Sequence, residues 1–123
     1  MTALEILMAA RAKMAGEGKY ACGSFAYTAG GDNAHPCDDD ATCWSAFGAV
    51  WSVSGRPWGK AAATLLRAFG GKPGRRHGRK AADHAHAVEC DAAVEPEDGS
   101  DVDMQGPALA AFDRAIASLE VAS

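Results

Sequence analysis

The chain lacks the features that mark membrane and secreted proteins. It has no run of eighteen consecutive apolar residues, so we expect no transmembrane helix and no membrane partner. Its first apolar stretch contains Glu5 and follows no basic cluster, which is not the pattern of a signal peptide. We therefore expect a cytoplasmic protein that works inside a bacterial host cell.

Catalytic motifs are also missing. No serine lies in a Gly-x-Ser-x-Gly context. The glycines of residues 70–78 lack the Gly-Lys-Ser/Thr ending and the preceding strand of a phosphate-binding loop. These absences favour a protein that is not an enzyme. Because the Cys and His of a nucleophilic pair meet in space and not in sequence, a small Cys/His hydrolase stays an alternative.

The four cysteines form no Cys-x2-Cys pair. Without an export signal they are expected to be reduced thiols or metal ligands and not disulfides. His86 and Cys90 are four residues apart, so on a helix they would share a face, and both are zinc ligand types. The candidate metal ligands are Cys37, Cys43, His84, His86 and Cys90.

A simpler interpretation of these residues has no metal. In it Cys22, Cys43 and Cys90 are small buried apolar side chains and the histidines are solvated. We favour this interpretation and expect no cofactor, with a zinc-stabilised module kept as an alternative.

The chain does have an uneven distribution of charge. The net charge is −4, yet residues 56–80 contain eight Lys and Arg and no Asp or Glu. Residues 81–123 contain ten acidic residues and one Arg. The glycine-rich segment 70–80 has little to bury and is predicted to be a basic flexible loop. The acidic segment 95–105 has the composition of a disordered segment.

Basic side chains on such a loop could neutralise several phosphates and bind nucleic acid or a nucleotide in a salt-dependent way. No aromatic residue lies within 70–80 to stack on bases, which argues against sequence-reading recognition of single strands. The alternative is a solvated loop, partly neutralised by the acidic region 89–103. The candidate partner-binding residues are Lys72, Arg75, Arg76, Arg79 and Lys80.

Helical patterns dominate the first half of the chain. Thr2 and Glu5 have the spacing of a capping box and predict a helix that runs to about Ala15. The apolar run after the acidic triplet 38–40 predicts a second helix, roughly residues 40–54, capped by that triplet. Gly48 lowers the propensity of this helix by about 1 kcal/mol relative to alanine. Its presence predicts that another backbone segment packs closely there.

Further elements follow from the same reasoning. The loose alternation of residues 20–28 is typical of a short strand, a hairpin arm or an extended segment. Pro57 suits the first turn of a third helix over residues 57–69. Residues 81–94 have the pattern of a weak fourth helix.

The last helix is predicted to begin at Pro107. Its apolar stripe should dock on the helix that carries Trp44 and Trp51, and consists of Leu109, Phe112, Ile116 and Leu119. The predicted fold is mainly α, a single domain over residues 1–123. It is a compact bundle of about four helices with a short extended or hairpin segment near residues 20–28.

Four segments, in this order, resemble a family of small bacterial and phage proteins, domain of unknown function 6197. They are Cys-Gly-Ser-Phe-Ala-Tyr-Thr-Ala from Cys22, Asp-Ala-Thr-Cys-Trp-Ser-Ala-Phe-Gly-Ala from Asp40, Ala-Ala-Ala-Thr-Leu-Leu-Arg-Ala from Ala61 and Ala-Leu-Ala-Ala-Phe-Asp-Arg-Ala-Ile from Ala108. The resemblance spans most of the chain. The family tends to have a cysteine where this chain has Ser45, and a Trp-Asn-Asp turn before the last helix. It carries no known activity, so the resemblance implies only the fold and a bacterial or phage setting.

Together these observations predict a small non-enzymatic interaction protein, encoded by a phage or a mobile element. It would bind a host protein or nucleoprotein through charged surfaces, for example as an inhibitor of a host defence system. One alternative is a nucleic-acid or nucleotide binder that uses residues 72–80. The other is the zinc-stabilised module or small hydrolase.

Overall fold

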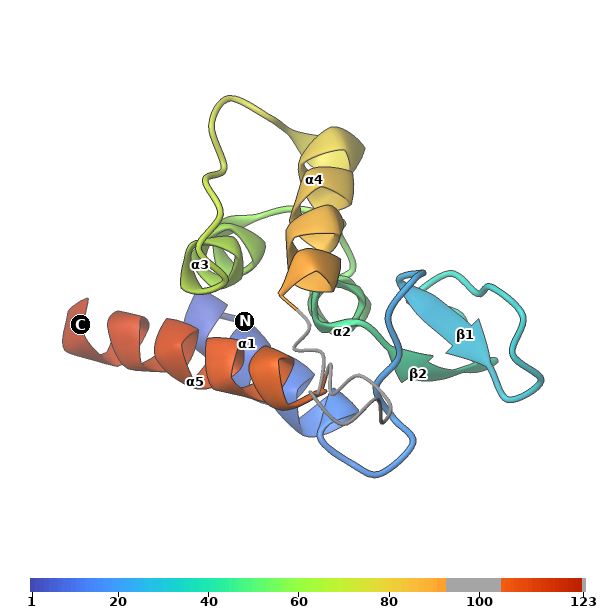
Figure 1. Cartoon of the computed structure of the whole chain (residues 1–123). Coiled ribbons are helices and arrows are strands. Elements are labelled where there is room, and N and C mark those ends of the chain that lie inside the picture. The colour runs from blue at the N-terminus through green and yellow to red at the C-terminus, as the bar shows by residue number, and fades with distance from the viewer. Residues whose placement is uncertain (93–104, 123) are drawn as a thin grey trace, which may run out of the picture.

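The computed structural model describes residues 1–92 and 105–122, which form five α-helices and one two-stranded sheet (Figure 1). The elements in chain order are α1 (Ala3–Met14), β1 (Ala26–Thr28), β2 (Ala41–Trp44), α2 (Ala46–Ser54), α3 (Lys60–Ala68), α4 (Gly78–Asp91) and α5 (Gln105–Ala122). The prediction of a mainly helical fold with a short extended segment is confirmed, with five helices where about four were expected. None of the helices within the described ranges combines the length and apolarity needed to cross a lipid bilayer.

Helix α1 begins as its sequence predicts. The Thr2 hydroxyl oxygen accepts the Glu5 N–H at 3.1 Å, and the Glu5 carboxylate accepts the Thr2 N–H at 3.0 Å. This reciprocal capping box satisfies two donors that have no partner inside the helix. The buried face of α1 carries Leu7, Ala10 and Met14.

The prediction of one helix over residues 40–54 is wrong in its first part. Residues Ala41–Trp44 form β2, which pairs antiparallel with β1 so that Ala26 lies opposite Trp44. Ser45 then caps α2, because its hydroxyl oxygen accepts the Gly48 N–H at 3.1 Å. The acidic triplet 38–40 is exposed before the strand and does not cap the helix. Pairing with the preceding strand β1 therefore overrides the local acidic signal.

Helix α2 is the most completely buried element, with every residue from Ala46 to Trp51 buried. A Cβ atom added at Gly48 would overlap the backbone carbonyl of Phe25, so the predicted close approach of another backbone segment is confirmed. The helix ends at Gly55, which has a left-handed φ of 78° and donates its N–H to the Trp51 carbonyl at 2.8 Å.

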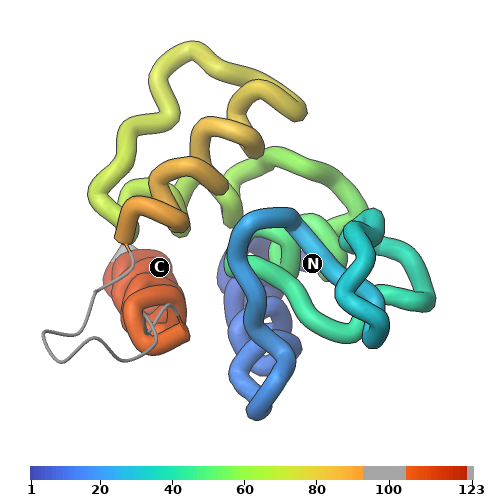
Figure 2. The backbone as a smooth tube through the Cα atoms, turned by 45° about the vertical axis from the view of Figure 1, so that its right-hand side comes forward, coloured from blue at the N-terminus to red at the C-terminus, as the bar shows by residue number. Residues whose placement is uncertain are grey.

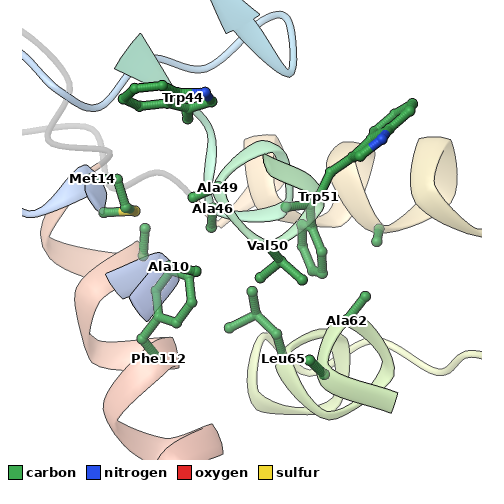
Figure 3. Close-up of a cluster of buried hydrophobic side chains, with 14 of the residues drawn as sticks. Ala10, Met14, Trp44, Ala46, Ala49, Val50, Trp51, Ala62, Leu65 and Phe112 are labelled. Carbon is green, nitrogen blue, oxygen red and sulfur yellow. The ribbon is translucent and has the colours of Figure 1, made fainter. Parts of the chain in front are cut away.

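The core forms where α1 and α3 pack against the buried face of α2, and α5 packs on α1 and α3. Figure 3 shows Met14 from α1, Val50 from α2, Leu65 from α3 and Phe112 from α5 gathered in this core. Helix α5 packs against α1 and α3, so the expectation that it docks on the tryptophan-bearing segment is wrong. Because its buried face is built from alanines around one phenylalanine, α5 can approach both helices closely.

Polar contacts hold α5 in this position. Arg11 of α1 forms an ion pair with Asp113 at 2.8 Å. Arg114 donates to the Ala68 carbonyl at the end of α3, also at 2.8 Å. Gln105 donates to the Met14 carbonyl at the end of α1 at 3.0 Å.

Two other predicted boundaries differ from the structure. Helix α3 begins at Lys60, so Pro57 lies before it and not in its first turn. Helix α4 begins at Gly78, so the connection between α3 and α4 covers residues 69–77 and is shorter than the predicted basic loop. The remainder of the predicted fourth helix beyond Ala92 lies outside the described residues, as does the acidic segment 95–105 except Gln105.

Candidate functional site

Helix α4 places a buried carboxylate at the start of α2. Glu89 is 2% exposed. Its Oε2 accepts the Ala46 N–H at 2.8 Å and the Tyr20 hydroxyl at 2.6 Å, and its Oε1 accepts the Phe47 N–H at 3.3 Å. These N–H groups belong to the first turn of α2 and have no acceptor within the helix. Glu89 therefore caps α2 from another helix, beside the Ser45 hydroxyl.

Burial raises the pKa of Glu89 from 4.5 to about 7, because an ionised carboxylate loses its hydration there. The hydrogen bonds from Tyr20, Ala46 and Phe47 oppose this effect, because they favour the ionised form. The sequence contains no local signal of this role, since the partners of Glu89 lie more than forty residues earlier in the chain.

Helix α4 also contributes two residues to a cluster of two sulfur atoms and an imidazole ring. Cys22 and Cys90 form a disulfide, which corrects the expectation of reduced thiols. The two sulfur atoms and a ring nitrogen of His86 lie within 4.8 Å of one another, and all three residues are partly buried. The prediction that His86 and Cys90 share a helix face is confirmed. We name Cys22, His86 and Cys90 the Cys–His cluster.

The remaining metal candidates do not join this cluster. Cys37 and Cys43 are free cysteines on the segment that leads to α2, one exposed and one partly buried. His84 lies on α4, and no group of three possible ligands includes it. Within residues 1–92 and 105–122 the Cys–His cluster is the one group of three. Sequence reasoning missed Cys22 as a ligand, because it is 68 residues away from Cys90.

His86 has one buried nitrogen without a partner. Its ring packs on Phe25 with centroids 4.6 Å apart, and its Nε2 has no hydrogen-bond partner in the described structure. Burial lowers the pKa of His86 below 6.5, opposed by the backbone of Ser24 and the charge of Asp83. At neutral pH the imidazole is therefore uncharged, which is the form that can ligate a metal.

The predicted basic residues divide into two groups. Lys72, Arg75, Arg76 and Lys80 are exposed, and no ion pair joins them to an acid in the described ranges. Arg79 instead pairs with Asp83 at 2.9 Å. We name the four residues of the first group, Lys72, Arg75, Arg76 and Lys80, the basic surface.

Arg79 also contacts aromatic rings. Its guanidinium lies 5.3 Å from the centre of the Phe25 ring and 5.4 Å from that of Trp51. These contacts join the start of α4 to the Phe25 and Trp51 rings. Arg79 therefore has a structural role that the sequence did not indicate.

The connection that carries Lys72, Arg75 and Arg76 stands apart from the rest of the molecule, and Lys80 follows it in the first turn of α4. In Figures 1 and 2 the connection between α3 and α4 arches away from the other elements. The alternative of neutralisation by residues 89–103 is wrong for Glu89, which is buried against α2. The segment 93–104 lies outside the described residues.

An open pocket of about 290 Å³ lies between the start of α1, the end of α2 and the start of α3. Its lining combines apolar side chains, among them Ile6, Val53 and Trp58, with the charged side chains of Arg56 and Lys60. No Cys, His, Asp or Glu lines it.

No protein-family model, curated protein or solved structure matches the chain. Its membership of the domain of unknown function 6197 family therefore stays a prediction.

Proposed function

We propose that the chain is a non-enzymatic binding protein that holds the phosphate backbone of a nucleic acid against its basic surface. The observation that carries this proposal is four exposed cations, none paired with a described acid: three lie on the connection between α3 and α4, and Lys80 lies in the first turn of α4. A cation next to a phosphate releases condensed counterions, which makes such binding favourable and dependent on salt.

The start of α4 adds to the attraction for an anion. Its cap residue His77 makes no side-chain hydrogen bond to the helix, and the first turn contains no acidic residue. The first N–H groups of a helix and its dipole favour negative charge at this end. Lys80 lies in the same turn, so side-chain and backbone charge act together.

The expected contacts are with phosphates and not with bases. The basic surface has no aromatic side chain on which a base could stack. Binding should therefore depend little on sequence and strongly on ionic strength.

The test measures fluorescence anisotropy of labelled duplex DNA, and of RNA of the same sequence, at 50 and 200 mM salt. The unaltered protein should bind at the lower salt and weaken steeply at the higher. Arg75→Glu/Arg76→Glu should weaken binding by roughly tenfold or more and lower the salt slope by about 2. For a matched comparison, Arg76→Glu is set against Lys19→Glu, which changes an exposed charge remote from this connection. Equal binding by the double variant, or no binding by the unaltered protein at 50 mM salt, would overturn the proposal.

The sequence also predicts a host protein as partner, with a phage or mobile-element origin and a role against host defence. A capture experiment from bacterial lysate with and without nuclease separates this partner class from nucleic acid. Partners that disappear after nuclease treatment support nucleic-acid binding. A different result would be a protein that is retained after nuclease treatment but is not captured by the Arg75→Glu/Arg76→Glu variant. That result would show that the basic surface binds a protein and not a nucleic acid.

A further inference from the structure

We propose that Cys22, His86 and Cys90 form a zinc site when the disulfide between the two cysteines is reduced. This inference is independent of nucleic-acid binding. Two of the ligands lie one turn apart on α4, and the third comes from the segment before β1. Their donor atoms already lie within 4.8 Å of one another.

The spacing fits tetrahedral zinc. Zn–S bonds of about 2.3 Å and Zn–N bonds of about 2.0–2.1 Å place neighbouring ligand atoms roughly 3.5–3.8 Å apart. The three donors therefore need shifts on the order of 1 Å to surround an ion, while the backbone of α4 holds two of them one turn apart. A water molecule would complete the coordination, as in zinc sites with three protein ligands.

The redox state of the sulfurs decides whether zinc can bind. In the disulfide neither sulfur is a thiolate. A dithiol reductant transfers two electrons and two protons to the Cys22–Cys90 bond, which breaks into two thiols, while the reductant becomes a disulfide. Zinc then binds both sulfurs as thiolates and releases the two protons.

The unpartnered nitrogen of His86 is an independent observation that fits a ligand. Buried polar atoms nearly always have a partner, and leaving one without a partner costs roughly 1–3 kcal/mol. A metal bound at Nε2 would supply the missing partner. The Phe25 ring, packed on the imidazole, limits how the imidazole can turn.

The site would replace one cross-link with another. Both the disulfide and a zinc ion join the segment around Cys22 to the last turns of α4. In the same place Glu89 connects α4 to the start of α2 and accepts a hydrogen bond from Tyr20. The junction would thus be held under oxidising conditions by the disulfide and under reducing conditions by the metal.

The first experiment titrates zinc alone into the full chain, oxidised or reduced with a phosphine, against a chromophoric chelator. The reduced protein should bind one equivalent and the oxidised protein none. Cobalt in place of zinc should give the near-ultraviolet absorption of a thiolate-to-metal transition. Failure of the reduced protein to bind stoichiometric zinc would overturn the proposal.

Variants locate the site. Cys22→Ser and His86→Gln should each weaken zinc binding by at least about tenfold, because one of three protein ligands is lost. The matched controls Cys37→Ser and His84→Gln should bind as the unaltered protein does. Equal affinity of all four variants would contradict the assignment.

A second measurement keeps the inference testable if a ligand variant does not fold. Reduced unaltered protein is alkylated with and without zinc, and the modified cysteines are identified by mass spectrometry. Zinc should protect Cys22 and Cys90 and leave Cys37 reactive. Protection of Cys37 and Cys43 in place of Cys22 and Cys90 would refute this site.

Discussion

The polar groups at the two ends of α4 lie in opposite environments, exposed at the start of the helix and buried at its end. At the start of the helix, Arg76 and Lys80 are exposed and have no described acidic partner. At its end, Glu89 is buried and accepts three hydrogen bonds, while Cys90 is bonded to Cys22. Substitutions at the buried end should therefore change folding stability, and substitutions at the exposed end should change binding.

Glu89→Ala should be the most destabilising change. It leaves the Ala46 and Phe47 N–H groups and the Tyr20 hydroxyl without their buried acceptor, and we expect a loss of roughly 3–5 kcal/mol. Urea unfolding followed by circular dichroism measures the loss. Glu89→Gln keeps an acceptor oxygen and should lose clearly less. Equal losses for the two variants would mean that side-chain packing, and not capping, stabilises this junction.

Reduction of the Cys22–Cys90 disulfide should have the next largest effect. The bond closes a loop across a separation of 68 residues, so its loss removes a constraint on the unfolded chain. In the presence of a chelator, reduction should lower the unfolding free energy by roughly 2–4 kcal/mol. Cys37→Ser serves as the control and should leave the unfolding midpoint unchanged. Reduction without any shift in the midpoint would show that the cross-link does not contribute to stability.

The stability of the oxidised protein should fall as the pH rises from about 4.5 to about 7. Because the pKa of Glu89 is raised to about 7 in the folded protein, the folded state holds a proton that the unfolded state releases above about 4.5. The contribution of Glu89 to the unfolding free energy is complete below about pH 4.5 and is lost by about pH 7. The total loss is up to about 3 kcal/mol. His86 acts in the opposite direction, because its lowered pKa makes folding less favourable as the pH falls below 6.5.

Denaturant unfolding across this pH range measures the effect, with Glu89→Gln as the comparison. The difference in unfolding free energy between the two proteins isolates Glu89 from His86 and from the exposed acids. A pH-independent difference would contradict the raised pKa.

The smallest effects are expected at the start of α4. Arg79→Ala should cost about 1 kcal/mol, because the residue contacts two aromatic rings and forms an exposed ion pair, which contributes little alone. The neighbouring Lys80→Ala should change stability by less than about 0.5 kcal/mol. Thermal unfolding of both variants measures the difference. A larger loss at Lys80 would show that it has a structural partner of its own.

Patterns between residues close in sequence predicted several features correctly. The capping box at Thr2 and Glu5 formed as expected, because both partners lie in one helical turn. The spacing of His86 and Cys90 placed them on one face for the same reason. Gly48 predicted the close approach of a backbone segment, although not that the segment would be Phe25.

The capping of α2 shows why other predictions were wrong. The acidic triplet 38–40 has the chemistry of a helix cap, yet residues 41–44 pair with β1 and separate the triplet from α2. Ser45 and Glu89 then satisfy the first N–H groups of α2. Glu89 comes from a helix more than forty residues later, and no local pattern distinguishes it from an exposed glutamate.

The helical character of the chain, the start of α1 and the concentration of positive charge between residues 56 and 80 can all be predicted from the amino-acid sequence. These properties depend on composition and on neighbours within about one helical turn. The structure was needed to show that Cys22 meets Cys90 and His86, that Glu89 caps α2, and that Arg79 pairs with Asp83 and contacts two aromatic rings. These contacts depend on which distant segments pack together and exclude water. A buried polar group then needs a hydrogen-bond partner, and the periodicity of the sequence does not specify which residue supplies it.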